Sequence, residues 1–83
     1  MKLHVLKIKK SYFYQVYNGY KKAELRKDDR DYEVDDLIHF VDEKGKEYEL
    51  FEDNIFIITN VLRNVQEYGL QDGYAILSIN KVR

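Results

Sequence analysis

The chain has 83 residues, no cysteine and a formal net charge of −1. This length predicts one domain over residues 1–83 with a compact core, and the absence of cysteine excludes disulfides and thiolate metal sites. No apolar run matches a signal peptide or a membrane-spanning helix, so we expect a cytoplasmic protein with no membrane partner.

Charge is distributed unevenly along the chain. Residues 1–30 contain nine Lys or Arg and three acidic residues, a net +6, whereas residues 31–83 contain five and twelve, a net −7. A basic patch of this kind binds anionic ligands even when the total charge is near zero. The alternative is that two solvated faces of opposite charge attract each other within one fold.

The first predicted element is a strand over residues 4–9. Apolar and charged side chains alternate there, which places His4, Leu6 and Ile8 on one face and indicates that this face is buried. We expect His4 to hydrogen-bond to the backbone at the end of the strand; a functional role is the alternative.

A short helix follows over about residues 11–18, with the Ser11 hydroxyl capping its first turn. Apolar side chains recur at the spacing of one helical face, at Phe13, Val16, Tyr17 and Tyr20. So short a helix is marginal alone, and the stripe must therefore pack on a sheet. Tyr12 and Tyr14 lie off this stripe, where they either stack on a base or are ordinary surface residues.

The helix is expected to end at Gly19, because glycine accepts a positive φ without a Cβ clash. A strand begins at Lys22, and its alternation puts Ala23 and Leu25 on one face. The opposite face carries a row of alternating charge formed by Lys22, Glu24 and Arg26. Lys21 lies at the joint between helix and strand, from which it can overhang this row.

Residues 27–36 form a charged turn and loop, and further strands are predicted at residues 37–41, 46–51, 55–65 and 74–82. The almost continuous apolar run of residues 55–65 is the expected central strand. Pairing of the final strand with the first would close a barrel. Five aspartates lie between residues 28 and 36, but without the spacing of a calcium loop, so we predict neither a metal site nor a cofactor.

The pattern Gly19-x-Lys21-x-x-Glu24-x-Arg26 resembles the signature of ASCH (activating signal cointegrator homology) domains, which belong to the PUA-like superfamily. Further segments are similar to its small bacterial and phage subgroup of unknown function: His4-x-Leu6-Lys7, Tyr12-Phe13, Arg26-Lys27-x-Asp29-Arg30-Asp31 and Gly69-Leu70-x-x-Gly73-Tyr74. The resemblance implies an α+β fold, a PUA-like open β-barrel of about six mainly antiparallel strands with a short helix after the first strand. Asp35 stands where family members usually have glycine, and aspartate tolerates positive φ better than most residues.

The same resemblance implies a cleft beside the motif that binds RNA or a modified nucleoside. Five cations surround the motif: Lys21, Lys22, Arg26, Lys27 and Arg30. Guanidinium groups grip phosphates or base edges, and the Glu24 carboxylate can accept hydrogen bonds from the exocyclic amine of a base. His4 also matches the family pattern and joins the candidate binding residues. The alternative is a row of ion pairs across the sheet.

Two other functions stay open. Some small ASCH relatives are amidohydrolases that act on acetylcytidine, and Lys21 matches their lysine, which with Glu24 would form the catalytic pair. Glu24 stands where those relatives have threonine, and residues 74–82 contain no acid to match their later glutamate. The acidic second half and the tyrosines suggest instead a protein-interaction module. We favour a binding protein over an enzyme.

Overall fold

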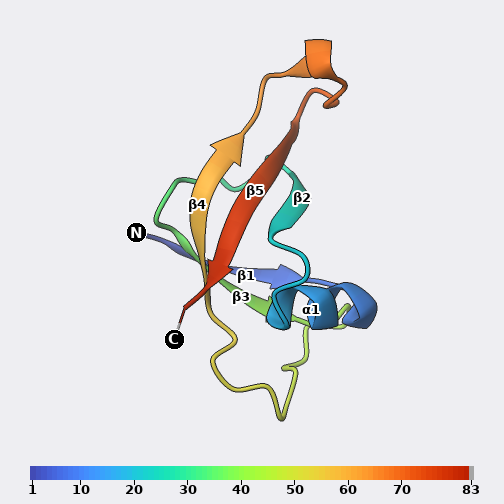
Figure 1. Ribbon diagram of the computed structural model, residues 1–83, viewed down its shortest axis with the longest axis vertical. Coiled ribbons are helices and arrows are strands. Elements are labelled where there is room, and N and C mark those ends of the chain that lie inside the picture. The colour runs from blue at the N-terminus through green and yellow to red at the C-terminus, as the bar shows by residue number, and fades with distance from the viewer. Residues whose placement is uncertain (83) are drawn as a thin grey trace.

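The computed structural model describes residues 1–82, in which five strands form one curled sheet with a helix at one end (Figure 1). The elements in chain order are β1 (Leu3–Lys7), α1 (Lys10–Tyr17), β2 (Ala23–Lys27), β3 (Leu37–Val41), β4 (Phe56–Leu62), the 3-10 helix η1 (Gln66–Tyr68) and β5 (Tyr74–Lys81). The sheet order is β1-β3-β4-β5-β2. This arrangement confirms an α+β fold resembling an open barrel, with five strands rather than six.

The sheet is mainly antiparallel, as predicted, but its two ends differ from the expectation. β1 pairs with β3 in parallel, and β5 lies between β4 and β2. The predicted closure of the last strand against the first is therefore wrong, because β2 and β4 occupy both sides of β5. β4, within the apolar run of residues 55–65, is the middle strand of the sheet, as predicted.

Residues 46–51 do not form the predicted strand. Their only ladder contact is an isolated bridge between Glu47 and Val41. Tyr48 stacks on Phe13 with ring centroids 4.1 Å apart, and Phe51 meets the same ring edge-on at 5.1 Å. Residues three apart point to opposite faces of a strand. The segment must therefore turn to bring both rings onto Phe13, and Leu50 accordingly has a φ of 73°.

The core lies between the helix and the concave side of the sheet. Phe13 and Val16 of α1 are buried against Phe40, Phe56 and Ile58 of the sheet, which confirms that the helical stripe packs on it. Tyr20 is 86% exposed, because the helix has ended before it. The predicted Ser11 cap is also wrong: Lys9 is the N-cap residue, no side chain caps it, and Ser11 lies inside the first turn.

Glycine and aspartate make the sharp turns after α1 and before β3. Gly19 has a φ of 82° immediately after α1, as predicted. Asp35, at the position where a glycine was expected, has a φ of 75°. Within residues 1–82, no helix combines the length and apolar character needed to cross a membrane.

Candidate functional site

Glu24 and Arg26 of the charged row point to the inner side of the curled sheet, where Glu24 binds both Arg26 and Lys21, whereas Lys22 is exposed. Glu24 is 5% exposed. Its Oε1 accepts a hydrogen bond from Lys21 Nζ at 2.7 Å. Its Oε2 accepts a hydrogen bond from Arg26 Nε at 2.9 Å and lies 2.8 Å from Arg26 Nη2 in the same ion pair. Both oxygens of the carboxylate are thus bound by cations. This arrangement favours the alternative of ion pairs across the sheet, because Glu24 is not free to accept hydrogen bonds from a base.

Arg26 and Arg30 reach from β2 and the following loop to β1. Arg26 Nη2 donates to the Lys7 carbonyl at 2.6 Å, and Arg30 Nη1 donates to the Val5 carbonyl at 3.3 Å. These carbonyls lie on the side of β1 that faces away from β3. The two guanidinium groups therefore bind the outer edge of β1 across the open side of the barrel.

Tyr32, from the same loop, is buried beneath these arginines. Burial raises the pKa of the Tyr32 hydroxyl, and the nearby positive charges of Arg26 and Arg30 act in the opposite direction. Its ring packs against the ring of His4, with centroids 4.8 Å apart. This aromatic contact fills the interior below the arginines.

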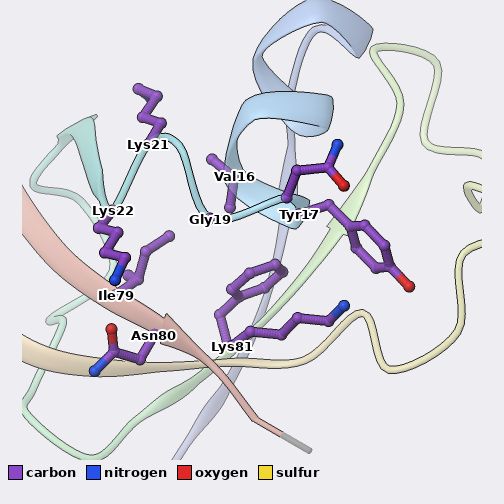
Figure 2. A pocket seen from close by; sticks show the side chains of 10 residues that line it. Val16, Tyr17, Gly19, Lys21, Lys22, Ile79, Asn80 and Lys81 are labelled. Atoms are coloured by element: carbon purple, nitrogen blue, oxygen red, sulfur yellow. The ribbon is translucent and has the colours of Figure 1, made fainter.

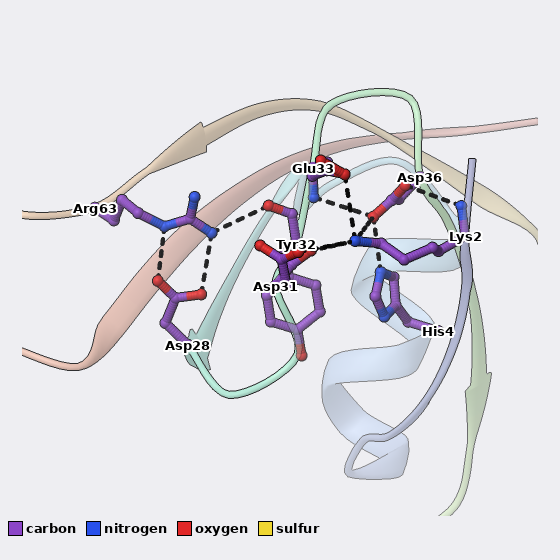
Figure 3. Close-up of polar contacts among 8 residues, drawn as sticks. All are labelled: Lys2, His4, Asp28, Asp31, Tyr32, Glu33, Asp36 and Arg63. Atoms are coloured by element: carbon purple, nitrogen blue, oxygen red, sulfur yellow. Dashed lines mark hydrogen bonds and ion pairs between the residues drawn. The ribbon is translucent and has the colours of Figure 1, made fainter.

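His4 is held by a buried carboxylate rather than by the backbone, which corrects the expectation (Figure 3). His4 is 6% exposed, and its Nε2 donates to Asp36 Oδ2 at 2.9 Å. Asp36 also accepts the backbone N–H groups of Lys2 and Glu33, each at 3.0 Å. One side chain thus joins the start of the chain, the loop before β3 and the inner face of β1.

The hydrogen bonds to Asp36 change its pKa. Burial alone would raise it, but the bonds from His4 and from the Lys2 and Glu33 backbone outweigh burial and lower the pKa to about 2. A carboxylate with a depressed folded-state pKa stabilises the fold at neutral pH and loses this effect in acid.

Acidification should therefore weaken the fold specifically through Asp36. Its contribution is complete above about pH 4 and disappears as the pH falls through about 2. We expect the difference in unfolding free energy between the parent chain and Asp36→Asn to shrink by about 2 kcal/mol from about pH 6 to about pH 2. Urea denaturation of both chains at each pH measures this difference, and a constant value would contradict the assignment.

Arg63 connects two parts of the loop after β2, a role that could not be predicted from the sequence. Its guanidinium binds Asp28 through two parallel contacts, at 2.7 Å and 3.0 Å, and also donates to the Tyr32 carbonyl at 3.1 Å (Figure 3). Such forked contacts fix geometry as well as charge. The only signal in the sequence was a single arginine near the end of an apolar run.

A hollow of about 480 Å³ lies beside the motif, at the end of α1 (Figure 2). Its polar lining consists of three lysines and two asparagines, with no acidic residue: Lys21, Lys22, Lys81, Asn18 and Asn80. Figure 2 shows that these groups come from the segment after α1 and from the end of β5. Two distant parts of the chain thus form one basic surface, which we call the lysine hollow.

The lysine hollow contains both fixed and free groups. Lys81 Nζ lies 3.4 Å from the centroid of the Tyr17 ring, and the Tyr17 hydroxyl donates to the Glu52 carbonyl at 2.6 Å. Within residues 1–82, the side chains of Lys22 and Asn80 make no hydrogen bond or ion pair. A ligand in the hollow would therefore meet one positioned ammonium group and two uncommitted polar groups.

The structure does not bring the predicted binding residues together in one site. Lys21 and Lys22 line the lysine hollow, whereas Glu24 and Arg26 lie in the ion-paired row behind it. The remaining three are outside the hollow: Lys27 is exposed on β2, Arg30 binds β1, and His4 is buried with Asp36. Sequence reasoning missed Asn80 and Lys81, because nothing in a strand pattern indicates that its last residues meet the end of a helix.

Comparison with known proteins identifies one family for this chain. No curated protein matches it. A family model described as a domain of unknown function, DUF3850, matches residues 3–79, which is almost the whole chain. The chain therefore belongs to the DUF3850 family of domains of unknown function.

Proposed function

We propose that the chain binds RNA or a modified nucleoside in the lysine hollow. The observation that carries this proposal is the composition of the lining, which has three lysines and no carboxylate in a chain whose net charge is −1. Lys21 is paired with Glu24 outside the lining, whereas within residues 1–82 Lys22 and Lys81 form no ion pair. Lysine binds phosphate as a point charge, and such contacts supply most of the sequence-independent affinity for nucleic acids. An anionic ligand is therefore the favoured occupant.

The amide groups give the hollow a means of recognising a base. Asn80 carries a carbonyl acceptor and two N–H donors, which suit the edge of an unpaired base. Tyr12 is half-exposed, with its ring 5.4 Å from Lys21 Nζ, and is a candidate for stacking beside the hollow. These groups favour a single-stranded segment or a free nucleoside over a duplex.

The resemblance to ASCH domains supports the same proposal by analogy. The half-barrel and the hollow next to Gly19 and Lys21 match what a PUA-like domain with a motif cleft would have. Similarity of fold alone does not identify a ligand, so the proposal depends on the residues that line the lysine hollow. A cytoplasmic location remains part of the proposal.

Hydrolysis of acetylated nucleosides receives less support. Lys21 and Glu24 are in contact at 2.7 Å, as a catalytic pair would be. However, a general base needs a free oxygen near the substrate, and the second oxygen of Glu24 already binds Arg26. Turnover of acetylcytidine, followed by mass spectrometry and abolished in Lys21→Ala, would replace the binding proposal.

Removal of two lysines from the hollow should weaken RNA binding. We expect Lys22→Ala combined with Lys81→Ala to reduce affinity for a labelled single-stranded RNA about tenfold. The slope of log affinity against log salt should fall by about 1.4, because each phosphate contact on a single strand contributes about 0.7. Fluorescence anisotropy at several salt concentrations measures both quantities.

The matched control is Lys44→Ala combined with Lys46→Ala, which removes the same charge from the exposed, acidic segment after β3. This control should retain the parental affinity and salt slope. Equal losses in the two double variants would show that binding follows overall charge alone. RNA binding that does not respond to salt, or no binding at all, would also contradict the proposal.

A further inference from the structure

We propose that Arg26, Arg30 and the Tyr32 hydroxyl bind a phosphate group on the open side of the barrel. This site is separate from the lysine hollow, because none of the three residues lines that hollow. The phosphate belongs either to a nucleic-acid backbone or to a small phosphorylated molecule. The inference adds a second anion site and does not depend on what the lysine hollow binds.

The Tyr32 hydroxyl is the observation that points to a ligand. Tyr32 is 1% exposed, and its hydroxyl points away from the contacts around Asp36 (Figure 3). Within residues 1–82 this hydroxyl makes no hydrogen bond, yet no fully enclosed side-chain nitrogen or oxygen in those residues lacks a partner. The hydroxyl must therefore reach the surface at the tip of a buried ring. Its hydrogen-bond partner has to come from outside the chain.

The two arginines leave further donors free. Arg30 uses only Nη1, on the Val5 carbonyl, so within residues 1–82 its Nε and Nη2 have no partner. The same pair of atoms in Arg63 holds both oxygens of Asp28. Such a fork also matches two oxygens of a phosphate. Arg26 uses Nε and Nη2, which leaves its Nη1 without a partner in the described part of the chain.

The spacing of the two guanidinium groups suits one phosphate. They bind the carbonyls of Val5 and Lys7, which are two residues apart on β1 and so about 7 Å apart along the strand. Charge-assisted hydrogen bonds of about 2.8 Å from each side allow one phosphate between the groups to contact both. Burial raises the pKa of Tyr32 and both guanidinium charges oppose this rise, so its hydroxyl lies near them.

The surrounding charges favour an anion with several oxygens. Glu24 is shared by two cations, Lys21 and Arg26, so this group keeps a net positive charge. The Asp28 carboxylate is held by Arg63 and does not occupy the free donors. A phosphate offers three strong acceptor oxygens, which match the three residues that have a free donor. A carboxylate ligand has only two oxygens and would leave one of these residues without a partner.

NMR of the arginine side chains tests this site directly. Titration with inorganic phosphate at constant ionic strength should shift the Nε–H signal of Arg30. Tyr32→Phe removes only the hydroxyl and should weaken the affinity read from this signal about tenfold. Urea denaturation should give the same stability for Tyr32→Phe and the parent, because the hydroxyl has no partner within residues 1–82. A role in folding alone would change the stability and not the affinity.

Arg30→Lys keeps the charge but removes the fork, and should also weaken phosphate binding about tenfold, followed at the Nε–H signal of Arg26. The matched control is Tyr68→Phe, which removes a hydroxyl from an exposed tyrosine and should keep the parental affinity. Single-stranded RNA without a terminal phosphate distinguishes the two sources: a response to it indicates a phosphodiester, and a response to inorganic phosphate alone indicates a small phosphorylated ligand. An Arg30 signal that responds to neither probe, or an unchanged affinity in Tyr32→Phe, would overturn the proposal.

Discussion

Glu24→Ala should destabilise the fold by about 3 kcal/mol, measured by urea denaturation at neutral pH. The substitution removes the carboxylate that contacts both Lys21 Nζ and the Arg26 guanidinium. Breaking a buried ion pair from one side is costly because the remaining charge stays poorly solvated. Lys21 is partly exposed, which places the expected cost at the lower end of the range for such pairs.

The control for this substitution is Glu47→Ala. Glu47 also makes a short polar contact, with its Oε1 2.6 Å from His39 Nε2, but its side chain is 64% exposed. Exposed pairs contribute about 0–1 kcal/mol, so this variant should be close to the parent in stability. Similar losses in the two variants would mean that the Glu24 carboxylate is not buried between its cations in solution.

Phe13→Ala should have the largest effect on stability, about 4 kcal/mol. Phe13 is fully buried and is the centre of an aromatic cluster that holds α1 on the sheet and the irregular segment after β3 on α1. Domains of this size have total stabilities of about 5–10 kcal/mol, so a large unfolded population is expected at 37 °C. Thermal and urea denaturation followed by circular dichroism measure the loss.

Tyr14→Ala is the matched control in the same helix. Its ring is half-exposed and lies 5.4 Å from that of Phe51, at the border of the cluster. Helix propensity changes in the same direction in both variants, so the difference between them reports core packing. We expect a loss of about 1 kcal/mol for Tyr14→Ala, and a loss equal to that of Phe13→Ala would refute the central role of Phe13.

The faces of the elements could be predicted from the sequence, because alternation and helical spacing depend only on neighbouring residues. His4, Leu6 and Ile8 are buried as their alternation indicated, and Phe13 and Val16 face the sheet. Each of these predictions used information within a few residues of the site. The positive φ of Asp35 instead agrees with the glycine that the resemblance to ASCH domains puts at this position.

Strand partners could not be predicted in the same way. Periodicity says which side chains are buried but not which strand lies alongside, so the parallel pairing of β1 with β3 was missed. For the same reason, only some of the residues that line the lysine hollow could be predicted. Lys21 and Lys22 belong to the motif, whereas Asn80 and Lys81 reach the hollow because β5 crosses the end of α1.

The strand order also has a consequence for the growing chain on the ribosome. β1 and β2 are synthesised first, yet they occupy the two edges of the finished sheet. β1 cannot pair until β3 has been synthesised. β2 cannot pair until β5 has been synthesised, and β5 is the last of the five strands in chain order. Between the synthesis of β2 and that of β5, nascent β2 has no partner among the strands of this sheet, and its edges are open to other chains during that interval.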